Sequence, residues 1–298
     1  MWNEFLTQYF QEYNYPQQGA QSLLAVLDQI LRHKALAPVF LGAVEEYART
    51  VPEVSEQVTA LMQRVHAAVL ETDLCPEAAD LLFFLLCMKH LKRRYEDAKL
   101  PTAYYRGVAD DLCAKLNECY ALKGIWGTFV ASWFSRFFVL GRFPIGRLQY
   151  ECIPVPESYC PEGYAHMAGQ LAVNVHIPSG KPLIRQEVQA SMAEAAQFYA
   201  PQFPDGRVLF ICHSWLLFPG HQKMLPQSSG IRGFMEEFTL MDTYDDPTGH
   251  DLWRIFYTEN TDNLDALPQN TSLQRAYGAW LKAGKGVGGG LGIRYIQV

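Results

Sequence analysis

The sequence predicts an α+β protein, in which an all-helical N-terminal domain of residues 1–142 precedes a mixed-sheet domain of residues 143–298. Up to about residue 140, the apolar residues recur at the three- and four-residue spacing of a helix face. After "GRFPIG", residues 141–146, apolar and polar residues alternate as they do in strands, so we place the domain boundary there. The chain has 298 residues, 49% of them hydrophobic, which is enough to bury a substantial core.

The first half predicts five or six helices. Apolar stripes run from Leu23 and from Val54, and the same spacing continues through residues 80–95, 105–120 and 125–140. Proline or glycine residues separate these segments. The longest apolar run, residues 81–88, is too short to cross a bilayer, so we expect a buried helix and no membrane partner.

The second half mixes strands with single helices, which indicates a sheet with helices packed on its faces. Alternating segments predict strands at residues 147–153, 171–177, 207–213, 238–244, 252–257 and 292–298. Helical spacing predicts helices at residues 183–199, near 231–237 and at 271–282.

Charge and cysteine usage exclude some classes of protein. The net charge of −6 and the scattered basic residues argue against a nucleic-acid partner. The first residues lack the basic start and long apolar stretch of a signal peptide, so we expect a cytoplasmic protein. The seven cysteines are irregularly spaced, which favours reduced thiols packed as small hydrophobes. The sequence does not determine the oligomeric state.

The helix at 271–282 carries one clean apolar stripe that contains Tyr277. From stripe position alone, Tyr277 is a core tyrosine whose hydroxyl finds a nearby acceptor. A second interpretation comes from its spacing. Asn270 precedes Tyr277 by seven residues, the spacing found after the fifth strand of the GCN5-related acetyltransferases, the GNAT superfamily.

Three longer segments strengthen this resemblance. They are "NVHIPSGKPL", "FICHSWLL" and "LQRAYGAWLKAGKGVGGGLG", and with them nearly the whole chain resembles a bacterial two-domain acyltransferase group. Proteins of that group have a helical N-terminal half and a GNAT-like C-terminal half.

The resemblance implies direct transfer of an acyl group from acetyl-CoA or another acyl-CoA, the cosubstrate, to the amine of a small molecule or peptide. It also implies that Tyr277 protonates the departing thiolate, because a phenol on a rigid helix is a suitable proton donor. Asn270 is assigned to the cofactor site as part of the same motif.

The coenzyme phosphates have two candidate sites. GNAT enzymes bind the pyrophosphate on a glycine-containing loop between a strand and a helix, but no such loop follows the strand ending at His213. "KGVGGG" offers Lys285, Gly288 and Gly290, although it precedes a strand and can equally form a flexible connection. The turn with Gly180 and Lys181 lies before a helix start, where backbone N–H groups are available to an anion.

Reactive side chains gather at the end of the strand at 207–213. The carboxyl ends of parallel strands face the crevice in which such sheets bind ligands, so His213 is a candidate general base and Ser214 a candidate cofactor contact. Successive strand residues point to opposite faces, so Cys212 and His213 cannot both face one pocket. An equal alternative is that His213 only satisfies backbone groups at the strand end. His176, at the end of the strand at 171–177, precedes the Gly180 turn.

The segment at 242–251 is rich in aspartate and also contains His250. It includes a turn signature, and turns favour these residues without a metal, so we predict no metal site. The acidic side chains could instead attract a cationic amine.

Two other functions stay open. A degenerate GNAT-like fold could bind a small metabolite or peptide without catalysis, which the missing pyrophosphate loop favours. A hydrolase could use Cys212 or Ser214, but no Gly-x-Ser-x-Gly motif surrounds the serine.

Overall fold

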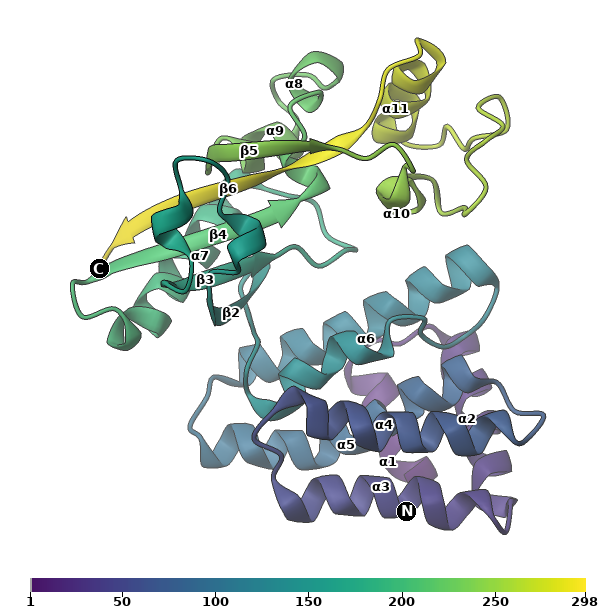
Figure 1. Ribbon diagram of the computed structural model, residues 1–298. Coiled ribbons are helices and arrows are strands. Elements are labelled where there is room, and N and C mark those ends of the chain that lie inside the picture. The colour runs from purple at the N-terminus through teal and green to yellow at the C-terminus, as the bar shows by residue number, and fades with distance from the viewer. Residues whose placement is uncertain (1) are drawn as a thin grey trace. The chain divides into compact units, whose positions relative to one another are not determined.

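The computed structural model describes residues 2–298, and the chain divides between Pro144 and Ile145 into two compact units (Figure 1). Each unit has its own core. The α+β class predicted from the sequence is confirmed, because helices fill the first unit and a mixed sheet forms the centre of the second.

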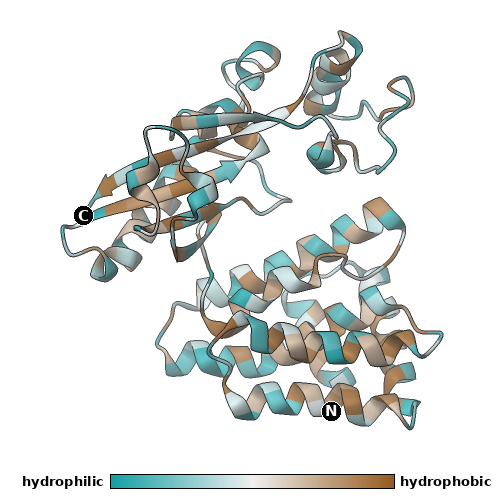
Figure 2. Ribbon diagram, in the orientation of Figure 1, coloured by the Kyte–Doolittle hydropathy of each residue, from teal (hydrophilic) through white to brown (hydrophobic). Residues whose placement is uncertain are grey.

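Six α-helices make up most of the described part of the first unit. Figure 2 shows hydrophobic and hydrophilic residues on the same helices, as expected where one face of each helix is buried. The helices are α1 (Trp2–Glu12), α2 (Gln17–Arg32), α3 (Leu36–Thr50), α4 (Ser55–Leu70), α5 (Pro76–Asp97) and α6 (Thr102–Lys123).

Helix α5 lies at the centre of this unit, as the apolar run within it predicts. Every side chain from Ala78 to Met88 is buried, so the helix is covered on all sides over that stretch. Between residues 2 and 298, no helix combines the length and the apolar character needed to cross a membrane.

The helix predicted at residues 125–140 is wrong over its first part. Residues 125–130 are not helical, and a 3-10 helix, η1 (Ala131–Val139), follows them. Gly127 packs so closely on the start of α5 that an added Cβ would lie 2.5 Å from the carbonyl carbon of Glu77. The neighbouring Thr128 N–H donates to the Glu77 carbonyl oxygen, so this contact replaces the first turn of the expected helix.

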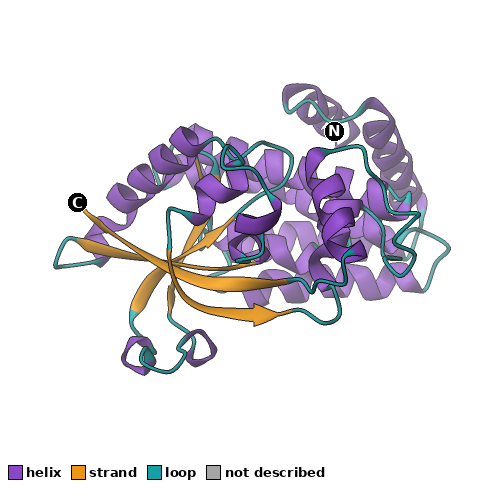
Figure 3. Ribbon diagram, turned by 90° about the horizontal axis from the view of Figure 1, so that it is seen from above, coloured by secondary structure: helices purple, strands orange, loops and turns teal. Residues whose placement is uncertain are grey.

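The second unit is built on a sheet, whose strands are orange in Figure 3. The strand order is β1-β2-β3-β4-β6-β5. β3 and β4 run parallel, whereas β2 with β3, β4 with β6 and β6 with β5 are antiparallel. The strands are β1 (Phe143–Ile145), β2 (Leu148–Pro154), β3 (Leu171–His176), β4 (Arg207–Ser214), β5 (Thr239–Asp245) and β6 (Gly288–Gln297).

Helix α7 (Arg185–Tyr199) connects the parallel strands and covers one face of the sheet. Its side chains Val188, Met192, Ala195 and Tyr199 are buried at helical spacing. The Tyr199 hydroxyl donates to the carbonyl oxygen of Tyr150 in β2, 3.0 Å away, so the helix is fixed to the strand it covers.

The strand predicted at residues 252–257 is wrong. The chain there forms a 3-10 turn, η6 (His250–Leu252), followed by a short helix, α10 (Trp253–Phe256). Leu252, Ile255 and Phe256 are spaced three and four residues apart and pack in one hydrophobic cluster with Tyr277. Helical spacing over so few residues is hard to distinguish from alternation.

Short helices and 3-10 turns complete the second unit. Helix α11 (Ser272–Lys282) begins at a capping box, in which the Thr271 hydroxyl accepts from the Gln274 N–H and the Gln274 side chain accepts from the Thr271 N–H. The remaining elements are η2 (Glu157–Tyr159), η3 (Ala165–Met167), η4 (Ala200–Gln202), η5 (Trp215–Leu217), α8 (His221–Met224) and α9 (Gly230–Met235).

Candidate active site

The parallel strands β3 and β4 stop pairing before they end. Their register pairs Val173 with Phe210 and Asn174 with Ile211, yet β3 continues to His176 and β4 continues to Ser214. In open sheets, ligands bind beyond the carboxyl ends of such strands. The ends of β3 and β4, with the start of α7, therefore form the candidate site.

A carboxylate and an amide surround the imidazole at the end of β3. His176 Nε2 lies 2.8 Å from Glu151 Oε1, and Asn174 Nδ2 donates to the same oxygen at 3.2 Å. Glu151 pairs with Asn174 in the β2–β3 register, and His176 is two residues further along β3, so all three lie on one face of the sheet.

Glu151 orients the His176 ring. Only 5% of Glu151 is exposed, so the carboxylate is largely withdrawn from water. A carboxylate partner at Nε2 favours the tautomer with its proton on that nitrogen, which leaves the lone pair on Nδ1. An imidazole oriented by a carboxylate is an arrangement that recurs in general-base catalysis.

His213 lies on the same face, one strand away. The register aligns Ile211 with Asn174, so His213, two residues further along β4, points to the side of His176. Its ring stacks between Tyr159, with centroids 5.0 Å apart, and Tyr244, with centroids 4.7 Å apart. Burial lowers the pKa of His213, while Asp251 acts in the opposite direction. The predicted role of His213 as general base stays a prediction.

Cys212 points to the opposite face and is fully buried. Burial raises the pKa of its thiol, which keeps the sulfur protonated and argues against a nucleophilic role. The Ser214 hydroxyl accepts from the Leu216 N–H at 3.1 Å and caps η5. Its predicted contact with the cofactor stays a prediction.

Tyr277 lies in the interior of the second unit. Only 2% of the residue is exposed, and its hydroxyl is 2.5 Å from Nε2 of the fully buried His221. Burial lowers the pKa of His221 to about 4, against the opposing effect of the Leu216 carbonyl. The neutral ring then donates from Nδ1 to Leu216 O, 3.3 Å away, and accepts from the Tyr277 hydroxyl at Nε2.

Tyr277 thus has the surroundings that its place on the apolar stripe predicts, a buried position with a hydrogen-bond acceptor for its hydroxyl. Burial also raises the pKa of Tyr277, so the phenol stays protonated. Its role as proton donor to a thiolate stays a prediction. The exposed Asn270 precedes the Thr271 cap, and its carbonyl accepts from Arg275 Nη1 at 3.2 Å.

The glycine run lies in β6 instead of in a loop. An added Cβ at Gly288 would overlap the backbone oxygen of Tyr244, and one at Gly290 would lie 2.8 Å from the backbone oxygen of Leu217. Close packing alone therefore explains why both positions are glycine, and a bound phosphate is not needed to explain them. Lys285 precedes the strand, with its ammonium 4.3 Å from the centroid of the Trp280 ring. Phosphate binding by this segment stays a prediction.

The second predicted cradle, residues 177–184, connects β3 to α7. Gly180 has a φ of +88° and is exposed, as is Lys181. The N-cap residue of α7, Ile184, makes no side-chain hydrogen bond to the first turn, so no side-chain cap occupies the first backbone N–H groups. Such groups can receive an anion.

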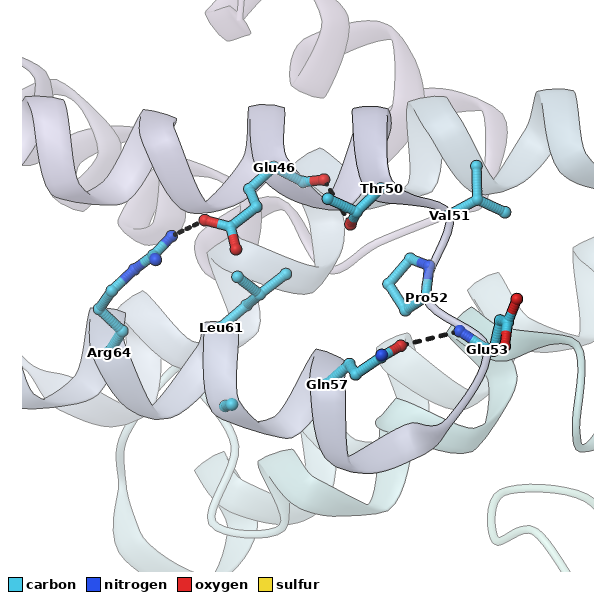
Figure 4. A pocket seen from close by; sticks show the side chains of 9 residues that line it. Glu46, Thr50, Val51, Pro52, Glu53, Gln57, Leu61 and Arg64 are labelled. Carbon is cyan, nitrogen blue, oxygen red and sulfur yellow. Dashed lines mark hydrogen bonds and ion pairs between the residues drawn. The ribbon is translucent and has the colours of Figure 1, made fainter.

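A hollow of about 580 Å³ in the first unit contains none of the predicted site residues (Figure 4). It lies where α3 and α4 meet, beside the loop at Val51 and Pro52. Arg64 Nη2 donates to Glu46 Oε2 at 2.8 Å, so the two opposite charges at one end of the hollow neutralise each other.

Among residues 2–298, no group of three or more His, Cys, Asp or Glu side chains is placed so that it could hold a metal ion. The acidic segment at 242–251 uses its carboxylates locally. Asp246 Oδ1 accepts from the Thr248 hydroxyl at 2.7 Å, and Asp251 Oδ1 accepts from Arg254 Nε at 2.7 Å.

Glu151 is a site residue that the sequence did not single out. Its signal was a carboxylate within the mostly apolar strand "RLQYECIP", where charged residues are rarely buried without a partner. Tyr159 and Tyr244 carried no comparable signal, because their meeting on His213 depends on the loop between β2 and β3 and on the β5–β6 pairing.

Solved structures share this architecture. An acyltransferase mutant in complex with octanoyl-CoA has a TM-score of 0.73 and 19% identity, covering 99% of this chain and 88% of its own. An acyltransferase in complex with decanoyl-CoA has a TM-score of 0.70 and 22% identity, covering 96% and 86%. An acyltransferase with decanoyl-CoA and teicoplanin has a TM-score of 0.64 and 20% identity, covering 97% and 99%. At these identities the likeness establishes the fold. No curated protein matches the sequence.

Two family models match in succession. The N-acyltransferase N-terminal domain matches residues 4–140, and the GNAT-like C-terminal domain matches residues 143–294. The resemblance predicted from Asn270, Tyr277 and the three longer segments is thereby confirmed. With the second match alone covering more than half of its length, this chain belongs to the family of proteins with a GNAT-like C-terminal domain, here preceded by an N-acyltransferase N-terminal domain.

Proposed function

We propose that this protein transfers an acyl group from acyl-CoA directly to the amine of a small molecule or peptide. Solved structures of the same fold were obtained with octanoyl-CoA and decanoyl-CoA, and one of them also contains teicoplanin. These structures support acyl-CoA as the cosubstrate and a small or peptide-like acceptor. The cytoplasmic location expected from the sequence stays a prediction.

The observation that carries the proposal is the contact between His176 and Glu151 at the end of β3, where β3 and β4 no longer pair. An acceptor amine is protonated near neutral pH, and it must lose a proton before its nitrogen can attack. His176, with its lone pair on Nδ1 and its ring oriented by Glu151, is the candidate base, because an imidazole can take up a proton and release it again.

The reaction forms a C–N bond and breaks the thioester C–S bond. The protonated amine first releases one proton to solvent through His176. The neutral nitrogen then attacks, the carbonyl carbon becomes tetrahedral, the nitrogen gives a second proton to His176, and the thiolate of the coenzyme leaves with a proton. Tyr277 is the donor suggested by the family resemblance, and protonated His176 is a second one. The start of α7, with Gly180 and Lys181, is the proposed phosphate site, since its first turn has no side-chain cap.

The decisive experiment compares His176→Gln with His213→Gln. Acyl-CoAs from acetyl to decanoyl are incubated with small amines and short peptides, and the acylated products are measured by mass spectrometry. We expect His176→Gln to lower kcat by roughly 100-fold or more, with the dissociation constant for CoA unchanged. An active His176→Gln enzyme would exclude this base, and a wild-type protein that binds no acyl-CoA would exclude the function.

A second candidate function is binding of a coenzyme or metabolite without transfer. The buried Tyr277 hydroxyl favours it, because a proton donor for a thiolate has to reach the reaction site. Wild-type protein that binds CoA by calorimetry but yields no acylated product from any acceptor would support this alternative.

A further inference from the structure

Arg147 binds three backbone carbonyls of one loop. It lies between β1 and β2, and only 7% of the residue is exposed. Its Nε donates to the carbonyl oxygen of Pro182 at 2.9 Å, Nη1 donates to that of Pro178 at 3.0 Å, and Nη2 donates to that of Lys181 at 2.6 Å. All three acceptors belong to the segment between β3 and α7.

A guanidinium suits this task better than any other side chain. It presents its N–H donors in a rigid planar fork, whereas an ammonium is a point charge on a flexible stem. The three carbonyl oxygens are therefore arranged around one rigid, planar group, and their hydrogen bonds to it fix the conformation of the loop.

The carbonyl contacts determine where the N–H groups of the loop point. In a trans peptide unit the N–H is opposite to the C=O. The carbonyl of Pro178 shares its peptide unit with the N–H of Ser179, and that of Pro182 shares its unit with the N–H of Leu183. Both N–H groups thus point away from Arg147. Gly180, with its φ of +88°, lies between them and supplies the change of direction.

The backbone on both sides of Arg147 is hydrogen-bonded to α7. Ser191 Oγ donates to the carbonyl oxygen of Ile145 at 2.5 Å and accepts from the Leu148 N–H at 3.3 Å. Gly146, with a φ of +60°, packs on Ser191, from whose Cβ an added Cβ would be 3.0 Å away. The turn that carries Arg147 is therefore attached to the helix that follows the loop.

We propose that Arg147 is a positioning residue for the coenzyme: it holds the loop at 178–183 so that its outward N–H groups, with the first turn of α7, receive the coenzyme phosphates. This inference rests on the proposed function. The guanidinium of Arg147 donates to the loop carbonyls, so we expect it to affect coenzyme binding by holding the loop and not by contacting the phosphates.

The test compares substrates with and without the phosphates. Arg147→Lys and wild-type protein are assayed with an acyl-CoA and with the matching acyl-pantetheine, which carries the same thioester but no phosphate. We expect the KM for acyl-CoA to rise at least about tenfold in Arg147→Lys, with kcat and the KM for acyl-pantetheine changed less than about threefold. Arg207→Lys, whose guanidinium stacks on Tyr295 in the same unit, is the matched control and leaves both KM values unchanged.

A second measurement needs no variant and remains decisive if Arg147→Lys does not fold. Amide hydrogen exchange of the wild-type protein is followed with CoA and with pantetheine. We expect CoA, and not pantetheine, to slow exchange at Ser179 and Leu183.

Equal rises in KM for both substrates would show that Arg147 only maintains the fold, and unchanged KM values would show that the loop does not depend on it. Either result overturns the inference, as does unaltered exchange in the presence of bound CoA. A wild-type protein that binds no CoA fails the proposed function instead, which separates the two failures.

Discussion

The buried pair of His221 and Tyr277 predicts a defined sensitivity to acid. His221 is fully buried, and burial lowers the pKa of its ring from the ordinary 6.5 to about 4. Below pH 6.5 the unfolded chain takes up a proton at this ring, whereas the folded chain does so only near pH 4. The stability that the neutral ring contributes is therefore complete above pH 6.5 and is lost as the pH falls from 6.5 to 4.

The size of this effect follows from the two pKa values. Each pKa unit corresponds to about 1.4 kcal/mol, so the full contribution is about 3 kcal/mol. Between pH 7 and pH 5, the linkage relation gives a loss of about 2 kcal/mol in the free energy of unfolding from this ring alone.

The perturbation is His221→Gln, because a glutamine amide can accept from Tyr277 and donate to Leu216 O but does not titrate. Urea unfolding at pH 7 and pH 5 gives the free energy of unfolding of each protein. We expect wild type to lose about 2 kcal/mol more than His221→Gln on acidification. The exposed His250 gives the control variant His250→Gln, which should behave as wild type. Equal losses in wild type and His221→Gln would refute the reasoning.

Three other substitutions test the site and its supports. Replacing Glu151 by Gln removes the carboxylate that orients His176, so we expect kcat to fall about tenfold or more with CoA binding retained, and unchanged kcat would contradict the assignment. Ser191→Ala leaves three buried hydrogen-bond partners unsatisfied, and denaturant unfolding should show a loss of about 3 kcal/mol. Gly288→Ala should lower the free energy of unfolding by about 3 kcal/mol or more, because the added Cβ would meet backbone atoms. Gly286→Ala, with open space around it, should change that free energy by less than about 0.5 kcal/mol. Similar values for the two variants would contradict the packing argument.

The sequence predicts elements well where one periodicity extends over several turns. The stripe of α11 and the buried run of α5 both appear as expected, because more than ten residues with one period leave few alternatives. The segment at 252–257 shows the opposite case. It is too short to establish a period, and the hydrophobic cluster around Tyr277 determines its helical form.

The two histidines of the candidate site were predictable from the sequence, but their partners and their assembly were not. His176 and His213 could be located at strand ends from local patterns. That they share one face depends on the register between β3 and β4, and that Glu151 reaches His176 depends on the β2–β3 register. Such pairings link distant parts of the chain, and no local pattern encodes them.

The seam between β3 and β4 has a mechanical consequence. In the described part of the chain, only two residue pairs, Val173 with Phe210 and Asn174 with Ile211, are in register between β3 and β4, and they connect strands β1-β2-β3 to strands β4-β6-β5. Each half, β1-β2-β3 and β4-β6-β5, has its own ladder of backbone hydrogen bonds. A change in the spacing of β3 and β4 beyond these pairs would therefore leave both ladders intact, because each ladder lies within one half of the sheet.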